Sequence, residues 1–149
     1  MDAQNREWHY RLDTEGNLWH DGSVFDDPNV LKLFMRKMEH LPDGRYFALC
    51  QGEKCYFEPD DTVYVVQKVD IQPNRVVLGF QGGYQEPLDP STLHVGKDNV
   101  FYCRAREGRF EARFNRRPYL ELAHLAEYDP KARKYFLRLG EKRYPIAGI

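Results

Sequence analysis

The sequence predicts an α+β fold built from two tandem units, each a β-hairpin, a helix and a second β-hairpin (ββαββ), in a pseudo-twofold arrangement. Two observations support this fold class. The pattern Gly-Glu-Lys-x-Tyr occurs at 52–56 and again at 140–144, each time directly after an apolar run of strand type. Upstream of each copy, a proline begins an amphipathic segment, Pro28 in the first and Pro118 in the second. A repeated order of elements indicates duplicated architecture, because each unit buries its apolar face against its neighbour.

The 149 residues divide into a first α+β repeat at 1–59, a central β segment with a crossover at 60–99, and a second α+β repeat at 100–149. An apolar fraction of 42% and an aromatic fraction of 14% suffice for a packed interior. No apolar run approaches the length of a membrane helix, and residues 1–6 lack a signal-peptide core. The three cysteines do not form a disulfide framework in this pattern. We therefore expect a cytoplasmic protein without a membrane segment.

The first repeat begins with strands at 9–12 and 17–20, joined by a stretch of turn composition. Asp27 then has the residue type of a helix cap, and Pro28 suits the first helical position, where its missing N–H costs nothing. Apolar residues recur from there at helical spacing, at Val30, Leu31, Phe34, Met38 and Leu41, until Pro42-Asp43-Gly44 ends the helix. Two further strands, at 45–50 and 54–58, form the closing hairpin.

The central segment holds the strongest strand pattern of the chain, at 62–69, which is dense in β-branched residues. A turn at 71–74 leads to a second strand at 75–80. The stretch 87–90 is predicted to be a loop that crosses to the second repeat. That repeat is expected to contain strands at 100–106 and 109–114, a helix that begins at Pro118 and ends at Asp129-Pro130, and a closing hairpin with strands at 135–139 and 143–146.

The charges are unevenly distributed although the net charge is only −1. Residues 1–99 hold 10 Lys/Arg and 17 Asp/Glu, which gives −7, whereas residues 100–149 hold 12 and 6, which gives +6. The two halves therefore attract each other within the fold or between protomers, or the basic half faces an anion. A pI near 6.5 argues against a general nucleic-acid binder.

A run of motifs in the first half resembles a known bacterial family. The order is Gly16-x-x-Trp19-x-x-Gly22-x-Val24, then Leu33-Phe34, then Asp43-Gly44-x-Tyr46, then Glu53-Lys54. It is similar to the domain-of-unknown-function family 1285, and the second half also follows that family's layout. The resemblance implies two related α+β units. It implies no activity, because none is established for the family, for which a regulatory or signalling role is only a suggestion.

Several residue groups are candidates for chemistry, and each also has a structural explanation. Glu53-Lys54 and Glu141-Lys142 follow a glycine in a predicted turn, where they bind a polar ligand or simply charge an exposed hairpin. Cys50 and Cys55 have wider spacing than a zinc knuckle and fit a buried-thiol interpretation better. Glu58 with Asp60-Asp61 lacks the ligand spacing of an EF-hand and fits an acidic turn. We accordingly predict no metal, no cofactor and no catalytic residue.

These observations favour a non-enzymatic ligand- or protein-binding or regulatory module with its site in a groove between the repeats. The arginines near the start of the second helix favour a small anionic ligand, because helix N-termini already attract anions. The expected lining is Trp19, Glu53, Lys54, Arg116, Arg117, Glu141 and Lys142. The alternative is an enzyme that uses a Glu–Lys acid/base pair in the same groove. A third hypothesis is a homo-oligomer held by the acidic and basic halves, which salt weakens.

Overall fold

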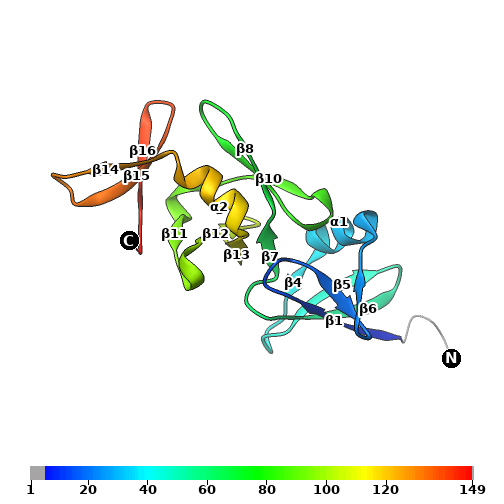
Figure 1. Ribbon diagram of the computed structural model, residues 1–149. Coiled ribbons are helices and arrows are strands. Elements are labelled where there is room, and N and C mark those ends of the chain that lie inside the picture. The colour runs from blue at the N-terminus through cyan, green and yellow to red at the C-terminus, as the bar shows by residue number, and fades with distance from the viewer. Residues whose placement is uncertain (1–5, 149) are drawn as a thin grey trace.

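The computed structural model describes residues 6–148 and has an α+β fold with two α-helices and four sheets, shown in Figure 1. The α+β class predicted from the sequence is confirmed. The start of the chain, where the sequence predicts no signal-peptide core, lies largely outside the described residues, as does Ile149. In the described part, no helix has the length and apolar character needed to cross a membrane.

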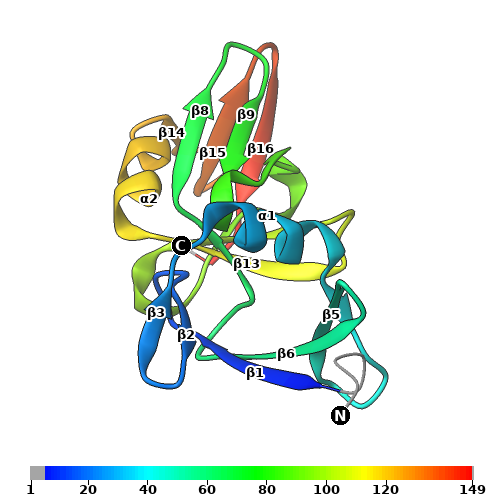
Figure 2. The same cartoon turned by 90° about the vertical axis from the view of Figure 1, so that its right-hand side faces the viewer.

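The first repeat forms one six-stranded sheet with the order β3-β2-β1-β6-β5-β4. Its strands are β1 (Glu7–Leu12), β2 (Leu18–His20), β3 (Ser23–Phe25), β4 (Glu39–His40), β5 (Tyr46–Cys50) and β6 (Glu53–Pro59). The pair β1 and β6 is parallel, and the others are antiparallel. Helix α1 (Pro28–Lys37) covers one face, where the rings of Tyr10 and Phe34 lie 5.6 Å apart, as Figure 2 shows for the helix and the two central strands.

Helix α1 begins as predicted but ends one turn early. The Asp27 carboxylate accepts a hydrogen bond from the Asn29 backbone N–H at 3.0 Å, which confirms the predicted cap. At the other end, Met38 has an extended backbone, and the next two residues pair with β5 as the short strand β4. The stacking of His40 on Tyr46, with ring centroids 4.4 Å apart, stabilises this strand. The prediction that the helix continues to Leu41 was therefore wrong.

The predicted strand at 62–69 is divided between two sheets at Gln67. Before it, β7 (Tyr64–Val66) is completely buried and pairs in parallel with β13 (Phe110–Phe114). After it, β8 (Lys68–Ile71) pairs with β9 (Val76–Gly79), and β10 (Gln85–Pro87) completes a three-stranded sheet. On the other side of β7, the buried Gln81 side chain replaces a strand neighbour. Its amide accepts from the Val65 N–H at 3.0 Å and donates to the Val63 carbonyl at 2.8 Å.

The second repeat has its two hairpins in different sheets, unlike the first. Strands β11 (His94–Val95), β12 (Phe101–Ala105) and β13 (Phe110–Phe114) form a sheet with β7, whereas β14 (Ala126–Asp129), β15 (Lys134–Leu139) and β16 (Lys142–Ile146) form their own. The order hairpin, helix, hairpin recurs. The tandem ββαββ arrangement is not confirmed, because β12, the counterpart of β1, pairs with β11 rather than with a strand of the closing hairpin, which lies in a separate sheet.

Helix α2 (Arg116–Ala123) begins two residues before Pro118, the predicted start, and ends before the predicted stop at Asp129-Pro130. Pro118 lies in its first turn, where the ring removes no intrahelical hydrogen bond and is buried. The residues from Ala126 onward leave the helix and form β14, which pairs with β15. The sequence pattern did not separate this short strand from the helix because its first two residues, alanine and glutamate, are strong helix formers.

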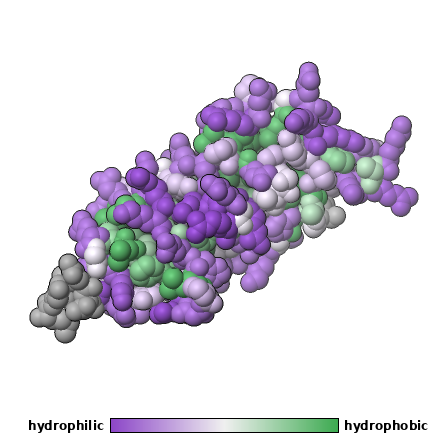
Figure 3. Space-filling model, turned by 180° about the vertical axis from the view of Figure 1, so that it is seen from behind, coloured by the Kyte–Doolittle hydropathy of each residue, from purple (hydrophilic) through white to green (hydrophobic). Residues whose placement is uncertain are grey.

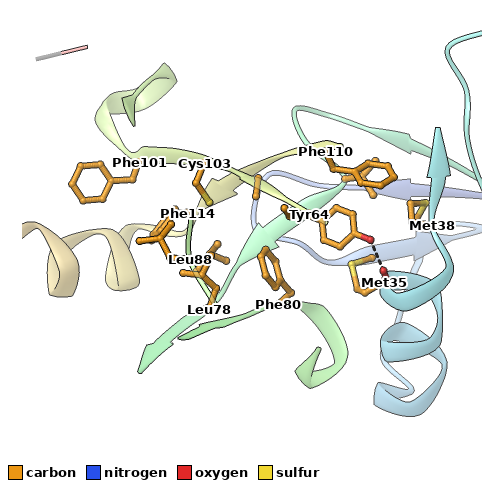
Figure 4. Packing of buried hydrophobic residues seen from close by; sticks show 14 of the residues in the cluster. Met35, Met38, Tyr64, Leu78, Phe80, Leu88, Phe101, Cys103, Phe110 and Phe114 are labelled. Atoms are coloured by element: carbon orange, nitrogen blue, oxygen red, sulfur yellow. Dashed lines mark hydrogen bonds between the residues drawn. The ribbon is translucent and has the colours of Figure 1, made fainter. Parts of the chain in front are cut away.

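A single hydrophobic core extends through both repeats, as Figure 4 shows. Tyr64 of β7 lies at its centre, with ring centroids 5.1 Å from Phe110 and 5.5 Å from Phe80. The Tyr64 hydroxyl donates a hydrogen bond to the Met35 carbonyl at the end of α1. The first repeat, the central segment and the second repeat are therefore packed against one another, so a hollow between them has firm walls.

Candidate anion-binding site

A hollow of about 450 Å³ lies where the first repeat meets the turn between β12 and β13. Its walls come from the end of α1, from β4 and β5, and from that turn. The lining residues are Arg36, Lys37, Glu39, Phe47, Leu49, Arg106 and Arg109. Four of them carry a positive charge and one carries a negative charge. We call this hollow the cationic pocket.

The end of α1 supplies two of the cations. Arg36 and Lys37 lie in the last turn of the helix, where positive charge also compensates the partial negative charge of the helix C-terminus. Both side chains are exposed, and no carboxylate of residues 6–148 lies within 4.0 Å of either. Because the chain turns away at Met38, these two side chains project beside β5 rather than along a longer helix.

Arg106 holds the β12–β13 turn against the end of α1. Its guanidinium donates to the carbonyl of Met35 at 2.9 Å, to that of Met38 at 3.5 Å and to the Tyr64 hydroxyl at 2.9 Å. Its backbone N–H donates to Glu86 at 2.9 Å. These contacts satisfy carbonyls that a helix end leaves without partners. They also neutralise the part of the helix that would repel an anion.

The geometry of the β12–β13 turn brings Arg109 into the lining of the pocket. Arg106, Glu107 and Gly108 all have positive φ, at 54°, 61° and 81°, and the Arg109 N–H closes the turn on the Arg106 carbonyl at 3.2 Å. Such a left-handed run gives a tight hairpin. Arg109 packs over the Phe110 ring at 5.6 Å and is exposed. Within the described chain, its guanidinium has no carboxylate partner.

In contrast to the cations of the pocket, Arg113 belongs to a cluster in which positive and negative charges are paired. The Arg113 side chain is 11% exposed and donates to Asp61 at 3.1 Å and to Asp98 at 3.0 Å. Asp61, whose side chain is 14% exposed, also accepts from the Tyr102 hydroxyl. Burial, together with this hydrogen bond, raises the pKa of Tyr102 to about 12. We call Asp61, Asp98, Tyr102 and Arg113 the paired cluster. Its charges bind one another, so it holds the central segment to the second repeat.

The structure places the first three predicted site residues in the six-stranded sheet. Trp19 donates from its indole nitrogen to Asp13 at 2.9 Å. Glu53 is half-buried and accepts from the Trp8 indole at 2.8 Å, whereas Lys54 is exposed. Neighbouring residues of a strand point to opposite faces. Glu53 and Lys54 therefore do not converge, which removes the geometric basis for a Glu–Lys acid/base pair at this hairpin.

The other four predicted site residues lie in two further places. Arg116 donates to the Asp98 carbonyl at 2.9 Å, and Arg117 lies 3.5 Å from Glu121, both at the start of α2. Glu141 and Lys142 are exposed at the β15–β16 turn. Figures 1 and 2 show β6 and β16 at opposite ends of the molecule. The structure therefore does not gather the seven residues into one groove, and their ligand-binding role stays a prediction.

The residues considered as metal ligands in the sequence make separate contacts in the structure. Asp60 forms a bidentate pair with Arg11, at 3.0 and 2.9 Å, whereas its neighbour Asp61 belongs to the paired cluster. Cys50 and Cys55 are both free thiols, and burial raises the pKa of Cys55 to about 11. Across residues 6–148, no three His, Cys, Asp or Glu side chains are grouped in a way that suits a metal ion.

Comparison with known proteins supports the fold. No family model and no curated protein matches the sequence. The structure is similar to that of a DUF1285 family protein from Silicibacter pomeroyi DSS-3, with a TM-score of 0.72 and 16% identity over 95% of this chain and 80% of that one. It is also similar to a DUF1285 family protein from Shewanella baltica OS155, with a TM-score of 0.61 and 17% identity over 77% of this chain and 90% of that one. The resemblance predicted from the sequence is thus confirmed in the fold, and at these identities the likeness is one of fold.

Proposed function

We propose that this protein is a non-enzymatic binding module that holds a small anion in the cationic pocket between its repeats. The observation that carries the proposal is the convergence of Arg36, Lys37 and Arg109 on one hollow without carboxylate partners among residues 6–148. Glu39 is the single carboxylate of the lining. In this proposal residues 1–59 supply one wall, residues 100–149 supply the opposite wall, and residues 60–99 join them.

The size and the stiffness of the pocket support this function. Its volume of about 450 Å³ is typical of sites for small ligands. The common core and the Arg106 contacts fix the distance between the two walls. The walls are therefore held at a fixed separation that an anion can bridge, from α1 to the β12–β13 turn. The exposed Arg36, Lys37 and Arg109 side chains still lose rotamer freedom when they bind it.

The test is a thermal-unfolding titration with inorganic phosphate and sulfate at constant ionic strength, so that screening does not change along the titration. We expect the unfolding midpoint to rise with anion concentration. A ligand at a hundred times its dissociation constant adds about 2.7 kcal/mol to the free energy of unfolding. The double variant Arg36→Glu/Lys37→Glu should lose this response. The matched control is Lys131→Glu/Lys134→Glu, the same change of net charge at two exposed residues at the β14–β15 turn.

Two outcomes contradict the proposal. One is the absence of any anion-dependent shift in the wild-type protein. The other is an equal shift in the wild-type protein and in the Arg36→Glu/Lys37→Glu variant, because the anion would then bind elsewhere. If Lys131→Glu/Lys134→Glu abolishes the response as well, the response reflects net charge rather than the cationic pocket.

A further inference from the structure

We infer that the ligand of the cationic pocket is an amphipathic dianion, a phosphomonoester that carries a short apolar group. This inference rests on the proposed function and adds the ligand class to it. Two features of the pocket carry it. Part of the lining is apolar and exposed, and the charged residues of the lining that are not engaged elsewhere have a net charge that matches a single phosphate group. The two features lie in the same hollow, so one molecule contacts both.

The apolar wall consists of Phe47 and Leu49, two residues apart on β5 and hence on the same face of the strand. Leu49 is 50% exposed, among the largest exposures of any large hydrophobic side chain in the described chain. The strand β4 pairs with β5 only at Tyr46 and Phe47, so Leu49 has a strand neighbour on one side only, at Lys54. A single exposed leucine is common on protein surfaces and does not by itself indicate a binding site. Beside three cations in a hollow, it gives an apolar group of the ligand a surface to cover.

The net charge of the pocket lining indicates the head group of the ligand. Arg36, Lys37 and Arg109 contribute three positive charges and Glu39 one negative charge, which leaves +2. Arg106 is left out of this sum because its guanidinium is engaged with the end of α1. A phosphomonoester carries a charge of about −1.5 to −2 at pH 7, and the fork of an arginine matches two of its oxygens. A carboxylate would leave one positive charge of the lining uncompensated.

The composition of the pocket favours a small molecule over an extended apolar partner, because only Phe47 and Leu49 of its seven lining residues are apolar. On the face shown in Figure 3, hydrophobic residues gather in separate patches with hydrophilic surface between them. A membrane or a large apolar partner covers contiguous apolar surface. The hollow itself has room for a phosphate and a short chain or ring within about 450 Å³.

The test is a calorimetric titration with inorganic phosphate and with methyl, butyl and hexyl phosphate. Affinity should rise about fourfold for each methylene group that is buried against the apolar wall. Leu49→Ser should flatten this dependence on chain length but leave inorganic phosphate bound. The matched control is Ile71→Ser, a similar change at a side chain that is 40% exposed on β8, outside the pocket. Hexanoate and hexanol test the head group, and both should bind more weakly than hexyl phosphate.

The outcomes separate this inference from the proposed function. Inorganic phosphate that binds through Arg36 and Lys37, with no gain along the alkyl series, supports the proposed function and overturns the inference. A gain that persists in Leu49→Ser overturns the assigned wall, and hexanoate that binds as tightly as hexyl phosphate overturns the dianionic head group. If no phosphate compound binds, both proposals are wrong.

Discussion

The two arginines Arg109 and Arg113 lie four residues apart on the same hairpin and have opposite surroundings. Arg113 is nearly buried, and its guanidinium is shared between two carboxylates and a tyrosine hydroxyl. Arg109 is exposed, has no carboxylate partner in the described chain, and faces a hollow with two further cations. A desolvated and fully paired arginine stabilises the fold and is unavailable to a ligand. An unpaired arginine beside a hollow stabilises little and is ready to bind.

We therefore expect substitutions in the paired cluster and in the cationic pocket to have different effects. Changes in the paired cluster should alter the free energy of unfolding and leave anion binding intact in the folded protein. Substitutions in the cationic pocket should weaken anion binding and leave the free energy of unfolding nearly unchanged. The boundary between them is Arg106, which lines the pocket and also holds α1. The predictions below test this division, beginning with the largest expected change.

Asp61→Ala should give the largest loss of stability, about 3 kcal/mol in the free energy of unfolding. The substitution leaves the nearly buried Arg113 without one of its carboxylates, and removing one partner of a buried pair costs several kcal/mol. The loss stays at the low end of that range because Asp98 still contacts Arg113. Urea unfolding measures the change, with the slope of the transition as a check on two-state behaviour.

The preceding residue provides the matched control. Asp60→Ala removes the same side chain one position earlier, where it pairs with Arg11 at the surface. Exposed pairs contribute little because water and salt screen them. Asp60→Ala should therefore cost far less than Asp61→Ala. Equal losses for the two variants would contradict the distinction between paired and exposed arginines.

Arg106→Ala should cost about 2 kcal/mol, because hydrogen bonds from a charged donor are worth roughly 1.5–3 kcal/mol and the end of α1 loses its partner. Chemical unfolding measures the loss, and amide hydrogen exchange should show faster opening at the end of α1. Arg104→Ala is the control, since Arg104 is exposed and its guanidinium has only a weak contact, at 3.5 Å, with the Gly108 carbonyl. A loss of stability no larger than that of Arg104→Ala would show that the Arg106 hydrogen bonds do not stabilise the end of α1.

The paired cluster should also make the protein sensitive to alkali. Burial and the hydrogen bond to Asp61 raise the pKa of Tyr102 from 10.0 to about 12, so the folded state favours the neutral phenol. The resulting stabilisation is complete below pH 10 and is lost as the pH rises through about 12. Tyr102→Phe should lose less stability than the wild-type protein across this window. Urea midpoints at several pH values measure it, and parallel curves for the two proteins would exclude a role for Tyr102.

The sequence predicts most of the strands because their signals are local. Alternating or β-branched runs and glycine turns locate β5, β6, β15 and β16 to within a residue or two. The division of 62–69 into β7 and β8 depends on pairing with β13 and β9, which are distant in sequence. The early end of α1 accompanies the pairing of β4 with β5, and Arg106, on a hairpin far along the chain, donates to a carbonyl at this helix end. Tertiary contacts overrode local periodicity at both places.

The candidate site was harder to predict than the fold. The sequence indicates a groove between the repeats and a small anionic ligand, but it directs attention to motifs that recur, such as Glu53-Lys54 and Glu141-Lys142. The residues that line the cationic pocket have no shared spacing. Arg36 and Lys37 look like the polar face of a helix, and Arg109 looks like an ordinary turn residue. Only the packing of the β12–β13 turn against α1 brings them together.

The smallest expected effect is at the arginines of α2. Arg116→Glu/Arg117→Glu should leave the affinity for inorganic phosphate within error of the wild-type value at constant ionic strength. Arg117 contacts Glu121, Arg116 contacts the Asp98 carbonyl, and neither lines the cationic pocket. An exposed arginine is therefore not expected to bind the ligand on its own. We expect binding where an arginine lines a pocket together with other cations. A strong loss of phosphate affinity in this variant would transfer the site to the start of α2, at two of the seven lining residues predicted from the sequence.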